Sequence, residues 1–193
     1  MMEAFLYKRL KDKKVRCDLC SHRCVIEEGR RGKCSVRENQ YGILKTLVFG
    51  KLIASHVDPI EKKPLFHFMP GSLSFSVSTV GCNFKCLFCQ NSDIAQMPAD
   101  TNGQILGDIV EPEAIVKAAK NNNCASISYT YTEPTIYFEY AYETAKIASR
   151  EGIKNVFVTN GYMTPEALQM IQPYLHAANV DLKAFNNDFY KDL

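Results

Sequence analysis

Hydrophobic and polar positions follow a regular pattern from about residue 73 onward. Leu73–Thr79 alternates apolar residues with Ser and Thr, which predicts a strand. Further short apolar runs lie at Cys124–Thr130, Asn155–Thr159 and Asn179–Lys183, and a helical pattern separates each run from the next. We therefore expect four strands that alternate with helices, whereas the Asn-, Asp- and Gly-rich stretch 90–107 is expected to be a loop.

The helices between these strands carry their own start and stop signals. Glu111–Lys120 has a proline in its first turn, and Pro134–Arg150 begins with proline and is followed by Gly152. Thr164 is expected to cap the next helix. Strand–helix units repeated at this spacing imply a parallel sheet with right-handed crossovers. The predicted fold class is α/β.

The chain before residue 73 has a different character. Residues 1–50 are rich in cysteine and charge and have few apolar positions, so they predict a small basic unit that needs a metal to stabilise it. Residues 51–72 contain three prolines and a glycine, which favours an extended connector with little regular structure. We expect three parts: the unit 1–50, the connector 51–72 and the core 73–193.

Composition narrows the class of protein. With 46% hydrophobic and 23% charged residues, the 193-residue chain is typical of a globular protein and unlike a disordered one. It has neither a membrane-length apolar run nor a signal peptide, so we expect a cytoplasmic protein without a membrane partner. Residues 1–50 hold 12 Lys and Arg against 6 Asp and Glu. That excess suits either a nucleic-acid contact or, as we favour, a solvated basic surface.

Cysteine points to the chemistry. A cytosolic chain is expected to keep its thiols reduced, and seven of its eight cysteines fall into two tight groups, which indicates metal. The stronger group, Cys82, Cys86 and Cys89, follows the first expected strand, where α/β folds bind ligands. Iron–sulfur clusters normally take four cysteines, so three leave one iron open, and an open position signals catalysis. A structural zinc site and free buried thiols are the alternatives.

The run CNFKCLFC resembles the CxxxCx(aromatic)C signature of the radical S-adenosylmethionine (SAM) superfamily, with Phe88 at the aromatic position. The runs DPIEKKPLFHFMPGS, SYTYTEPTIYFEY and VDLKAF are similar to the radical SAM member of the AmmeMemoRadiSam system, which is related to the pyruvate formate-lyase activating enzymes. The resemblance extends from Cys17 to Asp188 and implies a partial (βα)6 barrel. Because the chain ends after the fourth expected strand, we expect a truncated core of about four βα units.

The resemblance also implies a reaction. Cys82, Cys86 and Cys89 would hold a [4Fe-4S] cluster whose fourth iron is chelated by SAM. The reduced cluster would cleave SAM to a 5′-deoxyadenosyl radical, which would abstract hydrogen from an unidentified substrate, a protein among the candidates. An electron donor such as flavodoxin or ferredoxin is the implied partner. The alternative function is a non-catalytic, metal-stapled module that binds nucleic acid.

Further positions are implied as SAM contacts. Glu133 stands at the Glu of the superfamily's GGE motif, with Tyr131 and Thr132 in place of the glycines. Asp181 and Lys183, two residues apart on an expected strand, would share one face, although an internal ion pair is the alternative. The implied cofactor-binding residues are Phe88 beside the adenine, Glu133 at the SAM amino group, Thr159 and Asn160 of a TNG motif, and Asp181 and Lys183 of a DLK motif.

The second cysteine group comprises Cys17, Cys20, Cys24 and Cys34. Four thiolates form a closed ligand set, which suits structural Zn²⁺ or another iron–sulfur cluster. We favour Zn²⁺, because the unit is small and charged and lacks an obvious electron path. His22 lies within the group and could replace one cysteine.

Overall fold

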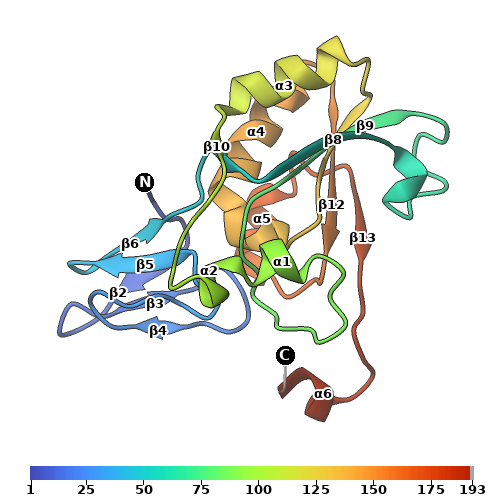
Figure 1. The fold of residues 1–193 in the computed structure, drawn as a ribbon. Helices are drawn as coiled ribbons and strands as arrows, with labels where there is room; N and C mark the ends of the chain where they lie inside the picture. Colours follow the sequence, from blue (N-terminus) through green and yellow to red (C-terminus); the bar gives the residue numbers. More distant parts are fainter. Residues whose placement is uncertain (192–193) are drawn as a thin grey trace.

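The computed structural model describes residues 1–191 and is built around a five-stranded sheet (Figure 1). The strand order is β13-β12-β11-β9-β8. Four strands are parallel, β9 (Leu73–Ser78), β11 (Ser126–Tyr129), β12 (Lys154–Thr159) and β13 (Ala177–Val180), and β8 (Ala54–Pro59) is antiparallel to β9. The predicted α/β class is confirmed. Within the described residues the sheet is open, with β13 and β8 as its edges.

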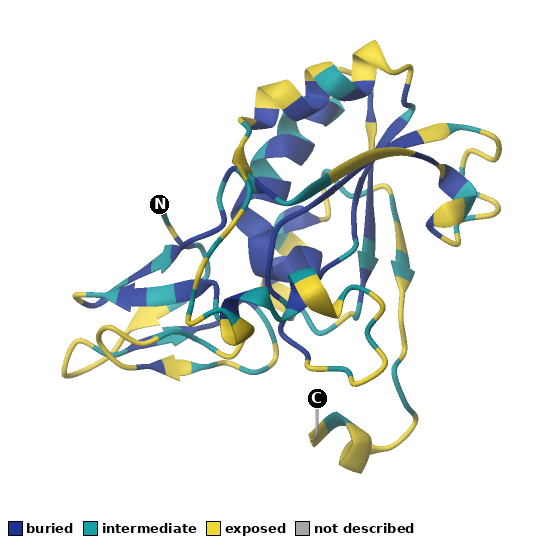
Figure 2. Ribbon diagram, in the orientation of Figure 1, coloured by how far each residue is buried: buried dark blue, intermediate teal, exposed yellow. Residues whose placement is uncertain are grey.

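The helices between the parallel strands match their sequence signals closely. They are α3 (Pro112–Asn121), the 3₁₀ turn η2 (Pro134–Tyr137) continuing into α4 (Phe138–Arg150), and α5 (Pro165–Ile171). The predicted cap of α5 is confirmed, because the Thr164 hydroxyl accepts the Ala167 N–H at 3.2 Å. The buried faces of α3 and α4 pack towards the sheet (Figure 2). None of the helices in residues 1–191 is long and apolar enough to cross a bilayer.

The segment 51–72 contains more regular structure than its composition predicts. It forms β7 (Lys51–Leu52), β8 and the 3₁₀ turn η1 (Ile60–Lys62), and β8 pairs with β9 from Ala54↔Ser78 to Pro59↔Leu73. Asp58 is the one buried residue of β8. An edge strand with so few buried side chains lacks the apolar alternation by which a strand is identified from sequence.

Two further expectations need correction. The fourth parallel strand ends at Val180, because its partner β12 ends at Thr159 and Thr159↔Val180 is their last pair. Asp181 and Lys183 therefore follow the strand. The stretch 90–107, expected to be a loop, contains the short helices α1 (Ser92–Ala95) and α2 (Met97–Asp100) and leads into β10 (Asp108–Ile109).

The first 50 residues form two small three-stranded sheets. Their orders are β1-β6-β5 and β2-β3-β4. The strands are β1 (Met2–Glu3), β2 (Tyr7–Arg9), β3 (Val15–Cys17), β4 (Val25–Ile26), β5 (Arg37–Gln40) and β6 (Ile43–Thr46). Val15, Val36 and Leu44 are fully buried and belong to the same hydrophobic cluster as Phe75 and Ile127 of the main sheet. The Cys-rich unit therefore shares a core with the rest of the chain. The last described helix is α6 (Asn187–Lys191).

Candidate functional site

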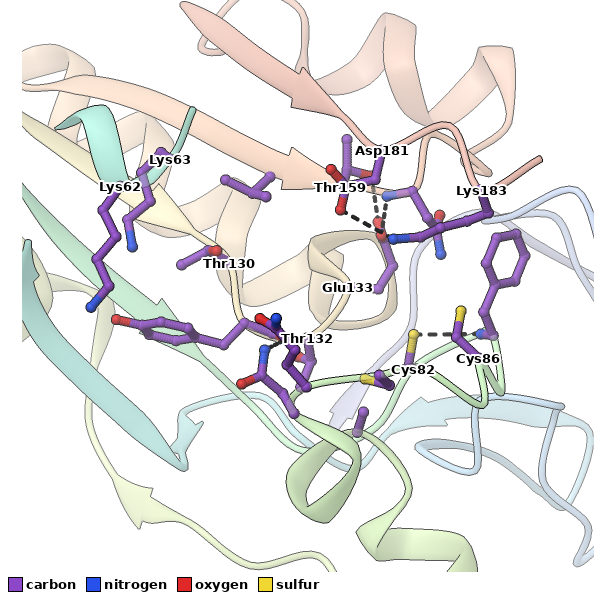
Figure 3. A pocket seen from close by; sticks show the side chains of 18 residues that line it. Lys62, Lys63, Cys82, Cys86, Thr130, Thr132, Glu133, Thr159, Asp181 and Lys183 are labelled. Atoms are coloured by element: carbon purple, nitrogen blue, oxygen red, sulfur yellow. Dashed lines mark hydrogen bonds and ion pairs between the residues drawn. The ribbon is translucent and has the colours of Figure 1, made fainter. Parts of the chain in front are cut away.

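A cavity of about 490 Å³ lies at the carboxyl ends of the parallel strands (Figure 3). Its walls come from the segments that follow β9, β11, β12 and β13, together with η1. The structure brings all the residues predicted for the cluster and SAM into this lining except Phe88. They are Cys82, Cys86, Cys89, Glu133, Thr159, Asn160, Asp181 and Lys183.

The cysteine loop begins at a glycine that the fold requires. Gly81 has φ +100°, and a Cβ there would lie 2.6 Å from Val36 of the N-terminal unit. The Phe84 N–H donates to Cys82 Sγ at 3.4 Å. Burial raises the pKa of Cys82 to about 12 and also raises the pKa of Cys86. Without a bound metal these thiols are therefore neutral, and binding a metal ion displaces their protons.

Glu133 is buried between the ends of two strands. Its Oε1 accepts from the Thr135 N–H at 3.0 Å, the Thr135 hydroxyl at 2.5 Å and the Thr159 hydroxyl at 2.7 Å. Within residues 1–191 its Oε2 accepts only from the Asn160 N–H, at 2.8 Å. Burial raises the pKa of Glu133, whereas these hydrogen bonds lower it. Oε2 therefore has room for another donor from the cavity, while Oε1 fixes the side chain as the cap of η2.

The two residues before Glu133 shape the same turn. Tyr131 has φ +64°, a left-handed conformation that glycine adopts freely and other residues rarely adopt. Its carbonyl accepts from Asn91 Nδ2 at 2.9 Å, so the turn is tied to the segment after the cysteine loop. The Thr132 hydroxyl donates to the Thr79 carbonyl at 2.9 Å. The hydrogen bonds to Asn91 and Thr79 therefore stabilise this turn although it contains no glycine.

The residues after β13 reach back towards the cysteines. Lys183 Nζ lies 3.2 Å from Asp181 Oδ2, so the two side chains form an ion pair while both line the cavity. Phe88 has a different position: it is 57% exposed, and its ring centroid lies 6.1 Å from that of Phe189. Its contact with an adenine stays a prediction.

The four N-terminal cysteines line a second, much smaller cavity. Cys17, Cys20, Cys24 and Cys34 surround a space of about 20 Å³, together with Arg37. Burial raises the pKa of Cys20 to about 11 and that of Cys34 to about 12. In residues 1–191, no three His, Cys, Asp or Glu side chains already lie at single-ion ligand distances. The four thiols are thus gathered around one space without being drawn onto a common centre.

The sequence did not reveal that the two cysteine groups are in contact through a few side chains. His22 Nε2 donates to the carbonyl of Asn83 at 2.8 Å, inside the cysteine loop. Asn83 Oδ1 in turn accepts from Asn160 Nδ2 at 2.8 Å. The Ser21 N–H donates to the Tyr162 carbonyl at 2.8 Å. His22 therefore links the N-terminal unit to the loop of the main cavity.

Comparison with known proteins identifies the family. The family model described as "Radical SAM superfamily" matches residues 76–193, which include the cysteine loop and every parallel strand from β11 onward. The chain belongs to the radical SAM superfamily. Radical SAM proteins use a [4Fe-4S] cluster, SAM and an electron donor. Three thiols and a buried carboxylate around one cavity are a donor set that fits this cofactor pair.

Two relatives from Methanocaldococcus jannaschii are similar to this radical SAM chain. Uncharacterized protein MJ0808 is 48% identical over 191 residues, which are 99% of this chain and 56% of the relative. Uncharacterized protein MJ0674 is 27% identical over 179 residues, which are 89% of this chain and 46% of the relative. The chain therefore spans about half the length of the curated relatives it matches.

Proposed function

We propose that this chain carries the cofactor-binding part of a radical SAM enzyme that abstracts hydrogen from its substrate. The observation that carries the proposal is the shared lining of one cavity by Cys82, Cys86, Cys89 and Glu133, at the sheet edge where α/β folds bind ligands. When bound, the reduced [4Fe-4S] cluster and SAM supply a 5′-deoxyadenosyl radical.

In this proposal the chain's own residues bind and orient the cofactors. The three loop cysteines would ligate three irons of the cluster as thiolates. Glu133 accepts a hydrogen bond from the SAM ammonium at Oε2, and the hydroxyls of Thr135 and Thr159 hold its other oxygen in place. Asp181 and Lys183, which line the same cavity, would both face the SAM ribose and carboxylate.

We further propose an activating-enzyme-like reaction. The runs DPIEKKPLFHFMPGS and SYTYTEPTIYFEY support this, because they are similar to the AmmeMemoRadiSam protein and its relatives among the pyruvate formate-lyase activating enzymes. From that similarity we propose that the substrate is a protein. We also propose a flavodoxin or ferredoxin as the electron donor. We also propose that the chain is divided into three parts, 1–50, 51–72 and 73–193. A cytoplasmic location is part of the same proposal.

For the N-terminal site we propose a structural Zn²⁺ held by Cys17, Cys20, Cys24 and Cys34. Four thiolates around a divalent ion carry a net charge of about −2. Arg37 lines the same small space, is buried, and has no hydrogen-bond partner for its Nε and Nη1 in residues 1–191. A guanidinium in that position stabilises an anionic metal–thiolate centre.

The nucleic-acid alternative gains no support from four of the six arginines in residues 1–50. Arg16 and Arg23 form ion pairs with Asp18, Arg31 pairs with Glu38, and Arg37 pairs with Glu139. Side chains held by internal carboxylates are less available to neutralise phosphates.

The proposed function is tested by replacing one loop cysteine. Cys86→Ala is expected to lose about four irons per chain and all reductive cleavage of SAM to 5′-deoxyadenosine, since each thiolate is a required ligand. Iron and sulfide are quantified after anaerobic reconstitution, and the nucleoside product is measured with a chemical reductant. Cys124→Ala is the matched control, because Cys124 is a buried thiol outside both groups. SAM cleavage retained in Cys86→Ala contradicts the proposal.

A further inference from the structure

The cavity has a second, basic end that none of the predicted SAM residues occupies. Lys62 and Lys63, at the end of η1, line it together with Tyr131. In Figure 3 these lysines lie across the cavity from Cys82, Cys86 and Lys183. The segment that follows edge strand β8 therefore places two ammonium groups in the same cavity as the loop cysteines.

One carboxylate serves both lysines. Asp58 Oδ1 lies 2.7 Å from Lys62 Nζ, and its Oδ2 lies 2.7 Å from Lys63 Nζ. Oδ2 also accepts the Tyr131 hydroxyl at 2.6 Å. The neighbouring Glu61 carboxylate accepts the Gly71 N–H at 2.7 Å, and within residues 1–191 it forms no ion pair with Lys62 or Lys63. Two cations share a single anion, and the network retains one net positive charge.

Burial of the Lys63 ammonium costs free energy. The Lys63 side chain is only 2% exposed, and burial lowers its pKa while Asp58 raises it. Of its three donor hydrogens, one is used by Asp58, and the ammonium lies 4.8 Å from the centroid of the Tyr131 ring. The buried Ser76 hydroxyl lies beside Asp58 and Tyr131. A buried cation with unused donors is stabilised by an anion that binds in front of it.

We propose that Lys62 and Lys63, with the Tyr131 ring as a wall, bind an anionic group of the substrate, a carboxylate or phosphate oxyanion. The inference rests on the proposed function, because it treats the cavity as the common site of SAM and substrate. SAM does not account for this end: its sulfonium and amino groups are cations, and Lys183 is available for its carboxylate at the cysteine end. The lysines hold the substrate by its charge, at the other end of the cavity from the cofactor.

The test measures anion binding by the full chain after anaerobic reconstitution with iron and sulfide. Inorganic phosphate and acetate are titrated separately by calorimetry, with chloride adjusted to keep ionic strength constant, and the melting temperature is followed in parallel. We expect saturable binding of at least one of the two anions, and the one that binds distinguishes a phosphate from a carboxylate substrate. Lys62→Met is expected to weaken this binding at least about tenfold, through loss of a charge-assisted hydrogen bond.

Lys154→Met is the matched control, since exposed Lys154 lies at the amino end of β12, at the opposite end of the strands from the cavity. The Lys62 side chain is 59% exposed, so its replacement leaves the core intact. If neither anion binds, or if any anion that binds the parent chain binds Lys62→Met equally well, the lysines form an internal ion-pair network and the inference is wrong. SAM affinity and iron content are measured on the same samples. Lys62-dependent anion binding without iron or SAM binding refutes the proposed function and leaves the anion site standing.

Discussion

Glu133 uses its two carboxylate oxygens differently: one caps the turn η2, and the other lies at the cavity wall. As the cap of η2 it accepts the Thr135 N–H, and at the cavity wall it presents an oxygen with a single hydrogen-bond donor. At this position the sequence allows a helix-terminal carboxylate and a cofactor contact together. The structure shows the cap on Oε1 and leaves Oε2 for the proposed SAM contact.

Replacing Glu133 with Gln separates these interactions. Glu133→Gln is expected to weaken SAM binding by about 1.5–3 kcal/mol, the range for a hydrogen bond to a charged group, while the iron content is unchanged. The affinity is measured by calorimetry on the reconstituted chain. The new amide points a donor at the Asn160 N–H or at the Thr hydroxyls, so the melting temperature is recorded as well. Glu143→Gln, in which a helix-surface carboxylate is changed, is the control. Unchanged SAM affinity in a folded Glu133→Gln chain argues against this role.

At the scale of elements, a buried ion pair joins the N-terminal unit to the main fold. Arg37 of β5 donates to Glu139 of α4 at 2.8 Å, and their side chains are 2% and 1% exposed. The same Glu139 oxygen accepts the Phe5 N–H at 2.6 Å. Neither residue belongs to a recognisable motif, and they are 102 positions apart. The pairing could not be predicted from local patterns, because it arises only when β5 packs on α4.

Removing one partner of this pair leaves a buried charge alone. Arg37→Met is expected to lower the free energy of unfolding by about 3–5 kcal/mol, the typical cost of an uncompensated buried ion. In Arg37→Met/Glu139→Gln the stranded charge is gone and an oxygen for the Phe5 N–H remains, so part of the loss is recovered. Urea unfolding at equal metal content measures the free energy of unfolding of the single and the double variant. Arg150→Met, at the exposed end of α4, is the control. A loss below about 1 kcal/mol in Arg37→Met shows that the pair contributes little.

At the scale of the whole molecule, the two cysteine groups belong to one connected structure. The loop with Cys17, Cys20 and Cys24 reaches the cysteine loop of the main cavity through His22 and Asn83. The hydrophobic core is also continuous between the two parts. A metal ion bound by the N-terminal thiols would therefore stabilise a surface against which the main site is built, without touching SAM itself.

The triple variant Cys82/Cys86/Cys89→Ala isolates the N-terminal site. It is expected to bind about one Zn²⁺ per chain, and chelation is expected to expose residues 1–50 to protease, because metal binding and folding of this small unit are coupled. Metal analysis and limited proteolysis measure the two effects. Adding Cys17/Cys20/Cys24/Cys34→Ala to the triple variant gives the control, which should bind no zinc. Iron and sulfide in the triple variant would mean a second cluster, and absence of any metal would mean that the four cysteines form no site.

The sequence by itself determined the features that depend on local interactions. The alternation in Leu73–Thr79, the prolines at helix starts and the cap at Thr164 predicted strands and helices that the structure has, with shifts of a few residues at their ends. The spacing of Cys82, Cys86 and Cys89 indicated the cluster chemistry in the same way, because ligands within eight residues are brought together by their own loop.

Only the tertiary structure decided which distant residues meet. The partners Asp58 and Tyr131 are 73 positions apart, and His22 and Asn83 are 61 positions apart. β8 is a strand because β9 offers it an edge, and β13 stops at Val180 because β12 ends there. Backbone pairing and charge neutralisation depend on neighbours in space, which hydrophobic periodicity does not record. For the same reason, nothing in the connector sequence indicates that Lys62 and Lys63 line a cavity in the fold.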